Sequence, residues 1–347
     1  MNENRRVLLR RRPTGLPQAE DFAVVSEARP QPQGDDILVR NIYCSLAPAM
    51  RRWMDAESYA EPIPLNGPVR CVCLGRVVES GHAAFRPGDY VMTLGAVEEY
   101  SIVRADPWTF KIDLDGVSLS QYLSLLGLNA MTAYFGLLEI GRPRPGETVL
   151  ISGAAGSVGS MVGQIEKIKA CRTVGIAVGA SKCARLIDEF GFDAAVDYRD
   201  KDLQQLTRAI SIACPDGVDV YFDNVGGVVL DAALAVINTG ARLVECGMIS
   251  EYNASGPVAG PSNLFQIIGK GATMQGFLGR RYLDRHAEAK DQIKQWAAQG
   301  RIHAREHIEI GIENFHSAFM RLFDGTNDGT LILQVGAPGQ ADDSVQP

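Results

Sequence analysis

Residues 148–159 read TVLISGAAGSVG, a short apolar run that leads directly into three glycines, at positions 153, 156 and 159. The apolar run predicts a buried strand, and the apolar residues from Val158 to Ile168 recur at helical spacing. Glycines between a strand and a helix allow the backbone to approach a pyrophosphate closely, and the helix N-terminus offers unpaired N–H groups. The spacing G-x-x-G-x-x-G differs from the commoner G-x-G-x-x-G, so the strand–turn–helix context carries the prediction of a dinucleotide site.

The chain after this loop alternates between strand-like runs and segments of helix length. The runs cover residues 148–152, 173–177, 194–196, 218–222 and 242–246. Ser181 is expected to cap the second helix, and Gly191 to follow its end. This alternation predicts an α/β fold with a doubly wound parallel (Rossmann) sheet and right-handed crossovers.

The first 120 residues or so differ in style, with short strand-like runs at 37–39, 75–79 and 90–92 that proline and glycine separate. Near the C-terminus, a helical stretch around Phe315 and Phe319 leads to an apolar strand at 330–335. We predict a twisted β-rich substrate domain over residues 1–122 and a dinucleotide-binding domain over 123–312. Residues 313–336 are expected to return to the β-rich domain, and 337–347 to form a disordered tail.

Composition narrows the class of protein. The 347 residues carry a net charge of −7, which argues against a general role on nucleic acid or at a membrane surface. No uninterrupted apolar run approaches the ~20 residues that a membrane helix needs. The basic residues from Arg5 to Arg12 are interpreted as a charged strand edge.

The seven cysteines are odd in number and lack a Cys-x-x-Cys pair, so a reducing, cytoplasmic location is predicted.

Two cysteines lie two residues apart, Cys71 and Cys73, which on a strand puts both on one face. A redox or metal pair is conceivable there. No histidine lies near enough in sequence to complete a ligand set, so buried, idle thiols are the favoured interpretation.

The second strand indicates which dinucleotide binds. A site for NAD usually has an acidic residue at the end of this strand, where it accepts hydrogen bonds from the adenosine ribose. Here residues 177–182 read AVGASK, with no carboxylate and with a lysine, Lys182. A 2′-phosphate would be tolerated and attracted, so NADPH is the predicted cofactor. The alternative is that Lys182 is only a solvated helix residue.

Several longer stretches now resemble the zinc-independent medium-chain reductases, in particular the prostaglandin reductase, leukotriene hydroxydehydrogenase and curcumin reductase group. The resemblance runs from about Arg5 to Val335. Its most specific stretches are MTAYFGLL at 131–138, PGETV at 145–149, the phosphate loop, VGQI at 162–165, FGFD at 190–193, YFDNVGG at 221–227 and CGMISEYN at 246–253. The resemblance implies a β-rich, GroES-like domain beside a Rossmann domain, and a homodimer.

The resemblance also implies which residues contact the cofactor. The pyrophosphate would lie on Gly156, Ser157, Val158 and Gly159. Lys182 and Tyr198 fall where the family holds the 2′-phosphate. The nicotinamide half would be lined by Asn224, by Cys246, Gly247, Met248, Ile249, Ser250 and Tyr252, and by Phe277, Leu278 and Gly279. Asn327 matches a late asparagine that also reaches the cofactor.

A catalytic metal is not expected. Zinc-dependent relatives carry a Gly-His-Glu signature and four closely spaced cysteines, and neither is found in this sequence. His82 follows Gly81 but is followed by Ala83. The remaining histidines are expected at the surface; they are His286, His303, His307 and His316.

A site without a Lewis acid favours conjugate reduction of an enone or enal, because hydride attack at the β-carbon leaves an enolate that hydroxyl donors can stabilise. The family places a tyrosine beside the nicotinamide, and Tyr252 is the predicted proton donor; a purely packing role is the alternative. An ordinary tyrosine keeps its proton at pH 7 and can donate. The other candidate functions are a quinone oxidoreductase and an NADPH-binding protein without catalytic activity.

One departure from the family concerns the substrate pocket. The family commonly has Ser-Leu-Asp-Pro-Tyr-Met-Arg in the first domain, whereas residues 45–51 here read SLAPAMR. Ala49 therefore replaces the pocket tyrosine, which makes that wall larger and less polar and favours a bulkier substrate. Tyr59 matches another pocket tyrosine and is expected to compensate in part. The family's late Gly-Lys is changed to Gly329-Thr330.

Overall fold

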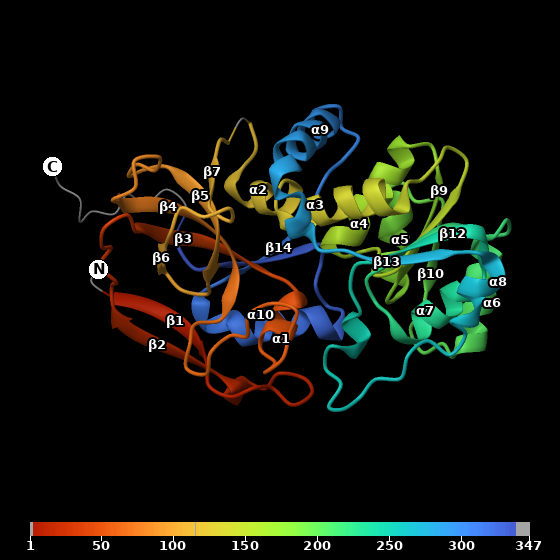
Figure 1. Ribbon diagram of the computed structural model, residues 1–347, viewed down its shortest axis with the longest axis horizontal. Helices are drawn as coiled ribbons and strands as arrows, with labels where there is room; N and C mark the ends of the chain where they lie inside the picture. Colours follow the sequence, from red (N-terminus) through yellow and green to blue (C-terminus); the bar gives the residue numbers. More distant parts are fainter. Residues whose placement is uncertain (1–2, 115, 338–347) are drawn as a thin grey trace. The chain divides into compact units, whose positions relative to one another are not determined.

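The computed structural model describes residues 3–114 and 116–337, and the chain divides into two compact units (Figure 1). The first unit consists of Met1–Leu123 and Glu306–Pro347, and the second of Ser124–Arg305. Each unit has its own sheet and its own hydrophobic core.

The sheet of the second unit has six strands, all parallel to their neighbours. They are β8 (Thr148–Ile151), β9 (Arg172–Ala177), β10 (Ala194–Asp197), β11 (Val218–Asp223), β12 (Ile237–Glu245) and β13 (Thr273–Gly276). Their order across the sheet is β10-β9-β8-β11-β12-β13, so the direction of winding reverses between β8 and β11. This is the order of a dinucleotide-binding sheet, and the predicted doubly wound fold is confirmed.

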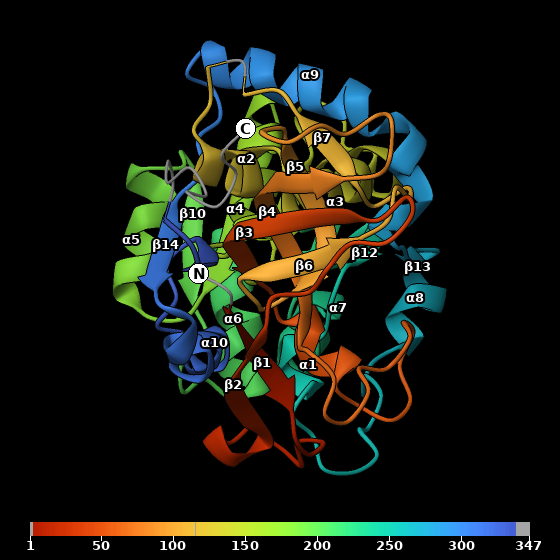
Figure 2. The ribbon, with the colours of Figure 1, turned by 90° about the vertical axis from the view of Figure 1, so that its left-hand side faces the viewer.

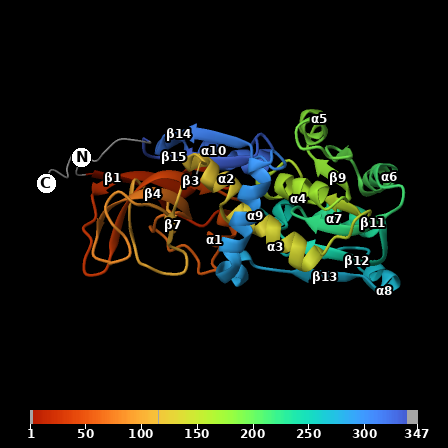
Figure 3. The same cartoon turned by 90° about the horizontal axis from the view of Figure 1, so that it is seen from above.

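Helices precede, connect and follow the strands of this sheet. They are α3 (Leu128–Phe135), η2 (Gly136–Gly141), α4 (Ser157–Ile168), α5 (Ala180–Asp188), α6 (Leu203–Ala213), α7 (Gly227–Leu234), η3 (Ile249–Glu251), α8 (Phe265–Lys270), η4 (Gly279–Arg285) and α9 (His286–Ala298). Right-handed crossovers put α4 and α5 on one face and α6 on the other, because the winding reverses after β10. Helix α3 packs on α4 and lies beside α9, and α6 packs on α7 (Figure 3).

Burial on both faces explains why the strands of this unit are continuous apolar runs in sequence. Leu150, Val174 and Val220 are fully buried on three adjacent strands. Removing a side chain of this size from water stabilises the folded state by roughly 1.5–3 kcal/mol. The central strands therefore form a firm base for the loops at their carboxyl ends.

The first unit is rich in antiparallel strands, as expected for the β-rich domain. Its main sheet has the order β14-β15-β3-β4-β5-β7, with β6 paired to β3, and β1 and β2 form a separate pair (Figure 2). The strands are β1 (Glu3–Leu9), β2 (Phe22–Ala28), β3 (Ile37–Leu46), β4 (Arg70–Ser80), β5 (Tyr90–Ala96), β6 (Tyr100–Val103), β7 (Phe110–Ile112), β14 (Glu306–Ile310) and β15 (Thr330–Gln334). Its helices are η1 (Ala19–Asp21), α1 (Ala49–Trp53), η5 (Ile312–Asn314) and α10 (Phe315–Asp324), and α2 (Leu119–Leu125) crosses the division between the units.

The C-terminal strands place the second division between the units at residues 305 and 306 rather than at 312 and 313. Strand β14 pairs in parallel with β15, and β15 pairs antiparallel with β3. Residues 306–312 therefore belong with the first unit, because their backbone hydrogen bonds join its sheet. The expected disordered tail, apart from Ala337, lies outside the described residues.

Two local expectations from the sequence are wrong. Helix α5 begins at Ala180 with Gly179 as its N-cap, so Ser181 lies inside the first turn and does not cap the helix. His286 is only 3% exposed, because its ring stacks on that of Phe135 at a centroid distance of 5.9 Å. Burial lowers the pKa of His286 to about 4, so its ring is neutral at pH 7.

One helical stretch, Leu119–Gly141, has the length and composition of a membrane span, although no uninterrupted apolar run of that length was expected. Isolated polar residues such as Asn129 and Thr132 interrupt the run without making it polar on average. However, 67% of its most apolar 18-residue segment is buried inside the protein, as in a core helix.

Candidate functional site

The glycine loop between β8 and α4 has the geometry of an anion site. Gly156 is the N-cap of α4 and supplies no side chain to occupy the backbone N–H groups of the first turn. A Cβ atom added to Gly159 would lie 2.5 Å from the carbonyl oxygen of Gly153, so only glycine allows the helix to pack this closely on the loop. The predicted contacts from Gly156 to Gly159 thus lie together at one helix end, where a pyrophosphate fits.

The loop lies where the winding of the sheet reverses, and Asn224 lies at the end of the neighbouring strand β11. The backbone N–H of Asn224 donates to the Ser152 hydroxyl at 2.8 Å, and its side-chain Nδ2 donates to the Ser152 carbonyl at 2.7 Å. Asn224 is therefore held rigidly beside the phosphate loop, as the ends of β8 and β11 in a dinucleotide fold would require.

Asp223 supports this arrangement, and the sequence analysis did not single it out. Its Oδ1 accepts hydrogen bonds from the Ser152 hydroxyl at 2.6 Å and from the Tyr221 hydroxyl at 2.8 Å. The N–H groups of Val225 and Gly226 donate to the same oxygen. Burial raises the pKa of Asp223, although these donors oppose the shift. The available signal was a carboxylate that directly follows the three apolar residues 220–222.

Glu245 lies opposite Asp223 on the adjacent strand β12. Burial, and the nearby carboxylates of Asp223 and Glu251, raise the pKa of Glu245 to about 8. Glu245 is therefore mainly protonated at pH 7, which avoids two adjacent buried charges. The sequence analysis also missed this residue.

The predicted nicotinamide contacts at 246–252 lie over the end of β11. Cys246 and Gly247 donate their N–H groups to the carbonyl of Asp223, at 2.9 and 3.1 Å. The hydroxyl of Ser250 donates to the carbonyl of Val225 at 2.6 Å. The structure thus brings this run together with Asn224.

Residues 277–279 follow the edge strand β13 and lie against the helices of the same unit. A Cβ atom on Gly136 would meet the Phe277 ring at 2.4 Å, and one on Gly279 would lie 3.3 Å from the Thr132 hydroxyl. Phe277 therefore rests on the junction of α3 and η2, and it is half-buried.

Two cationic side chains, Lys182 and Arg199, belong to the loop and helix regions that follow β9 and β10. Lys182 lies in the first turn of α5, and the guanidinium of Arg199 lies close enough to Gly179 that a Cβ there would be 3.0 Å from it. Tyr198 precedes Arg199 directly after β10, and burial raises its pKa. Arg199 is a cation that sequence reasoning missed, although it is next to a residue that was selected.

A carboxylate also lies near this turn. Asp197 accepts hydrogen bonds from the N–H groups of Gly179 at 2.7 Å and Arg199 at 3.0 Å. Burial alone would raise the pKa of Asp197, but these donors and the cations Lys201 and Arg199 lower it. Its Oδ1 therefore holds the turn in place.

The remaining residues that the sequence predicts to contact the substrate or the cofactor belong to the first unit. Ala49 begins α1, and the Tyr59 hydroxyl accepts a hydrogen bond at 3.0 Å from Nε1 of Trp53, the last residue of that helix. Tyr59 is 52% exposed. Asn327 lies between α10 and β15, and its N–H donates to the carbonyl of Arg321 at 3.2 Å. Ala49 thus begins α1 and Tyr59 is bonded to its last residue, whereas their part in a site with Tyr252 stays a prediction.

The described residues offer one candidate donor set for a metal ion. Within them, the only group of three or more His, Cys, Asp or Glu ligand atoms close enough to hold one ion is Cys44, Cys71 and Cys73, in the core of the first unit. His82 is not part of it. These residues do not make the histidine-containing site that a zinc dehydrogenase uses for catalysis.

Comparisons with known proteins agree with this geometry. Residues 5–110 match the family model described as the N-terminal domain of oxidoreductase, and residues 157–297 match that of zinc-binding dehydrogenase. The chain is 38% identical to the NADPH-dependent curcumin reductase of Escherichia coli, with 96% of this chain and 97% of that protein covered. It is 37% identical to the NADP(+)-dependent 2-alkenal reductase of Nicotiana tabacum, with the same coverage.

A solved structure is also similar, that of CurA from Vibrio vulnificus in complex with NADPH. Its TM-score is 0.90 at 38% identity, with 96% of this chain and 100% of that chain covered. The chain therefore belongs to the medium-chain dehydrogenase/reductase family of oxidoreductases, in the group that includes the curcumin and prostaglandin reductases.

Proposed function

We propose that this enzyme uses NADPH to reduce the C=C bond of α,β-unsaturated ketones or aldehydes. The observation that carries the proposal is the glycine loop at the reversal point of the sheet, with Asn224 and residues 246–252 held beside it. Relatives that share more than a third of its residues over nearly the whole chain are curcumin and 2-alkenal reductases.

The cofactor fits the residues of the second unit. Gly156 to Gly159 would hold the pyrophosphate, and Lys182 with Arg199 would hold the 2′-phosphate through charge-assisted hydrogen bonds. Asn224 and residues 246–252 would line the nicotinamide half. When bound, NADPH supplies a hydride to the β-carbon of the substrate.

The chain's own contribution to the reaction is the stabilisation of charge on the substrate carbonyl oxygen. The Tyr252 hydroxyl would donate a hydrogen bond to this oxygen as the enolate forms. The backbone bonds that tie residues 246–250 to the end of β11 would fix its position, which limits reorganisation during the reaction.

The substrate pocket is proposed to include Ala49 and Tyr59. Ala49 offers only a methyl group where the family has a phenol, so the wall formed by α1 would admit a bulky enone. Tyr59 would present an aromatic face to it, with its hydroxyl held by Trp53.

Zinc is proposed to take no part in the reaction. The cluster of Cys44, Cys71 and Cys73 contains no histidine, and its full burial keeps a substrate from reaching an ion bound there.

We also propose a cytoplasmic homodimer. All seven cysteines, which all lie within the described residues, are free thiols, as a reducing compartment favours. Strand β13 ends the sheet of the second unit, and Phe265 and Ile268 on nearby α8 are 73% and 74% exposed. A second copy pairing at this edge would cover both. Light scattering on wild type and Ile268→Glu tests this, with a monomeric wild type as the contrary result.

The function is tested by incubating the purified enzyme with NADPH and a panel of enones, enals and quinones, with products identified by mass. Saturated ketones or aldehydes are the expected products. Hydroquinones alone would favour the quinone oxidoreductase alternative, and tight NADPH binding without turnover would favour a non-catalytic protein.

A further inference from the structure

Three cysteine side chains meet in the core of the first unit. Cys71 and Cys73 lie two residues apart on β4 and so share a face, and Cys44 is the register partner of Cys73 on β3. The sulfur of Cys73 lies 3.8 Å from that of Cys44 and 3.4 Å from that of Cys71. All three residues are fully buried, and their sulfur atoms lie within 4.8 Å of one another.

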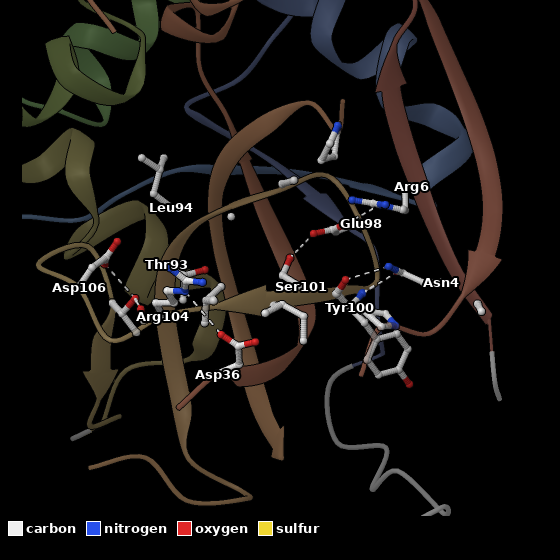
Figure 4. A pocket seen from close by; sticks show the side chains of 18 residues that line it. Asn4, Arg6, Asp36, Thr93, Leu94, Glu98, Tyr100, Ser101, Arg104 and Asp106 are labelled. Carbon is white, nitrogen blue, oxygen red and sulfur yellow. Dashed lines mark hydrogen bonds and ion pairs between the residues drawn. The ribbon is translucent and has the colours of Figure 1, made fainter. Parts of the chain in front are cut away.

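The same unit contains a cavity of about 630 Å³ (Figure 4). Its lining includes Thr93, Gly95 and Ala96 of β5, together with Glu98 and Ser101. The Glu98 carboxylate accepts from Ser101 at 2.6 Å and pairs with Arg6 at 2.7 Å. Oγ1 of Thr93 is buried and has no hydrogen-bond partner among the described residues.

The cavity lining contacts the sulfur cluster at Gly95 and Ala96. A Cβ atom on Gly95 would lie 3.2 Å from the sulfur of Cys73 and 3.3 Å from the Thr93 hydroxyl. The Cys73 thiol donates to the carbonyl of Ala96 at 3.1 Å. Cys73 therefore lies next to two residues of the lining, and an ion in the cavity would have to pass Gly95 to reach its sulfur.

We propose that Cys44, Cys71 and Cys73 form a three-coordinate site for a soft monovalent cation, Cu(I), which enters from the cavity past Gly95. Thiolates select soft cations, and structural zinc sites almost always have four ligands. The described residues supply three sulfurs here and no fourth side-chain ligand. Each cysteine releases its thiol proton when its sulfur coordinates as a thiolate, so Cu(I) binding releases protons to solvent and involves no electron transfer. This inference is independent of the proposed reductase activity.

The test is an anaerobic titration of the reduced, full-length protein with Cu(I) against a chromophoric Cu(I) chelator, followed by X-ray absorption at the copper edge. We expect one tight equivalent with sulfur scatterers only. Cys71→Ala should weaken binding by more than about 100-fold, since loss of outer-shell partners alone costs 10–100-fold. The matched control is Cys214→Ala, a buried thiol of the second unit that should leave binding unchanged.

Thermal unfolding of each variant shows whether it folds. Gly95→Ala keeps all three sulfurs, and it should slow Cu(I) uptake because its methyl group would crowd Cys73. If Cys71→Ala does not fold, the proposal is still tested by the wild type, through the number of Cu(I) ions bound and the atoms that surround the copper. Any of four results would overturn the proposal. The wild type could bind no tight equivalent of Cu(I), or the bound copper could have nitrogen or oxygen neighbours. A folded Cys71→Ala could keep the wild-type Cu(I) affinity, or the same cysteines could prefer Zn²⁺.

Discussion

The hydroxyl oxygen of Tyr252 accepts a hydrogen bond from the backbone N–H of Met248 at 3.3 Å. The bond is long, and in it the hydroxyl acts as an acceptor, so its own proton is not used there. Tyr252 is thus held by the same run of residues that lies over the end of β11. This bond fixes where the Tyr252 hydroxyl lies relative to that run.

Tyr252→Phe should lower turnover on an enone, because it removes the hydroxyl and keeps the ring. Loss of one oxyanion donor costs roughly 10²–10³ in turnover, and we expect the lower end or less because cofactor hydroxyls share the charge. NADPH affinity should change little. Steady-state kinetics and NADPH fluorescence titration measure the two effects, and wild-type turnover in the variant would assign Tyr252 to packing alone.

Lys182→Ala should weaken NADPH binding by ~1–2 kcal/mol, about 5- to 30-fold, with little effect on NADH. Arg199→Ala should act in the same direction, because its guanidinium lies at the same turn. Arg208→Ala, on the exposed face of α6, is the control and should change neither affinity. Equal losses for both cofactors at Lys182 would contradict its contact with the 2′-phosphate.

The fold could be predicted from the sequence because buried parallel strands contain continuous apolar runs, as at 149–151 and 220–222. Asp197 and Asp223 could not be given a role in the same way. Each acts on a loop that follows a neighbouring strand, Asp197 at Gly179 and Asp223 at Ser152. Such contacts depend on strand order and register, and the local sequence holds no information about either.

The same limit explains two other results. Cys71 and Cys73 share a face by their spacing, whereas Cys44 joins them only through the β3–β4 register. His286 has polar neighbours in sequence, and its burial depends on Phe135, 151 positions earlier by residue number, as a stacking partner. Long-range packing of this kind overrides the local preference for the surface.

Ala49→Tyr should shift substrate preference toward small enals, because it restores a phenol at the start of α1. Activity on large enones should fall, and activity on small enals should be kept or improved, as kcat/KM across a size series would measure. Tyr59→Phe removes only the hydroxyl that accepts from Trp53 and adds no volume, so it should leave the size preference unchanged. An unmoved preference in Ala49→Tyr would mean that residue 49 does not face the substrate.

Activity should survive prolonged dialysis against a strong chelator, and the purified enzyme should contain no stoichiometric zinc. The reason is that the described residues lack a histidine-containing ligand set with an open position. Metal analysis and the enone assay before and after dialysis test this. Activity that is lost and then restored by zinc would refute the metal-free mechanism.

Glu166 should make the second unit less stable as the pH rises. The residue lies in α4, is fully buried, and neither carboxyl oxygen has a hydrogen-bond partner among the described residues. Burial raises its pKa from 4.5 to about 8. The folded state therefore keeps a proton that the unfolded state releases above pH 4.5. The contribution is fully present below that pH and is lost up to about pH 8, with a slope of about 1.4 kcal/mol per pH unit.

Glu166→Gln keeps the shape of the side chain but cannot ionise, so this part of the slope should disappear. The melting temperature, measured from pH 5 to 8, should fall less steeply in the variant than in the wild type. Glu245, whose pKa is also raised to about 8, acts with the same sign and should leave a residual slope. Glu189→Gln removes an exposed carboxylate paired with Arg305 and should leave the slope as it is. If Glu166→Gln and the wild type show the same pH dependence, then the Glu166 carboxyl is ionised in the folded protein, and the buried space around α4 must admit water.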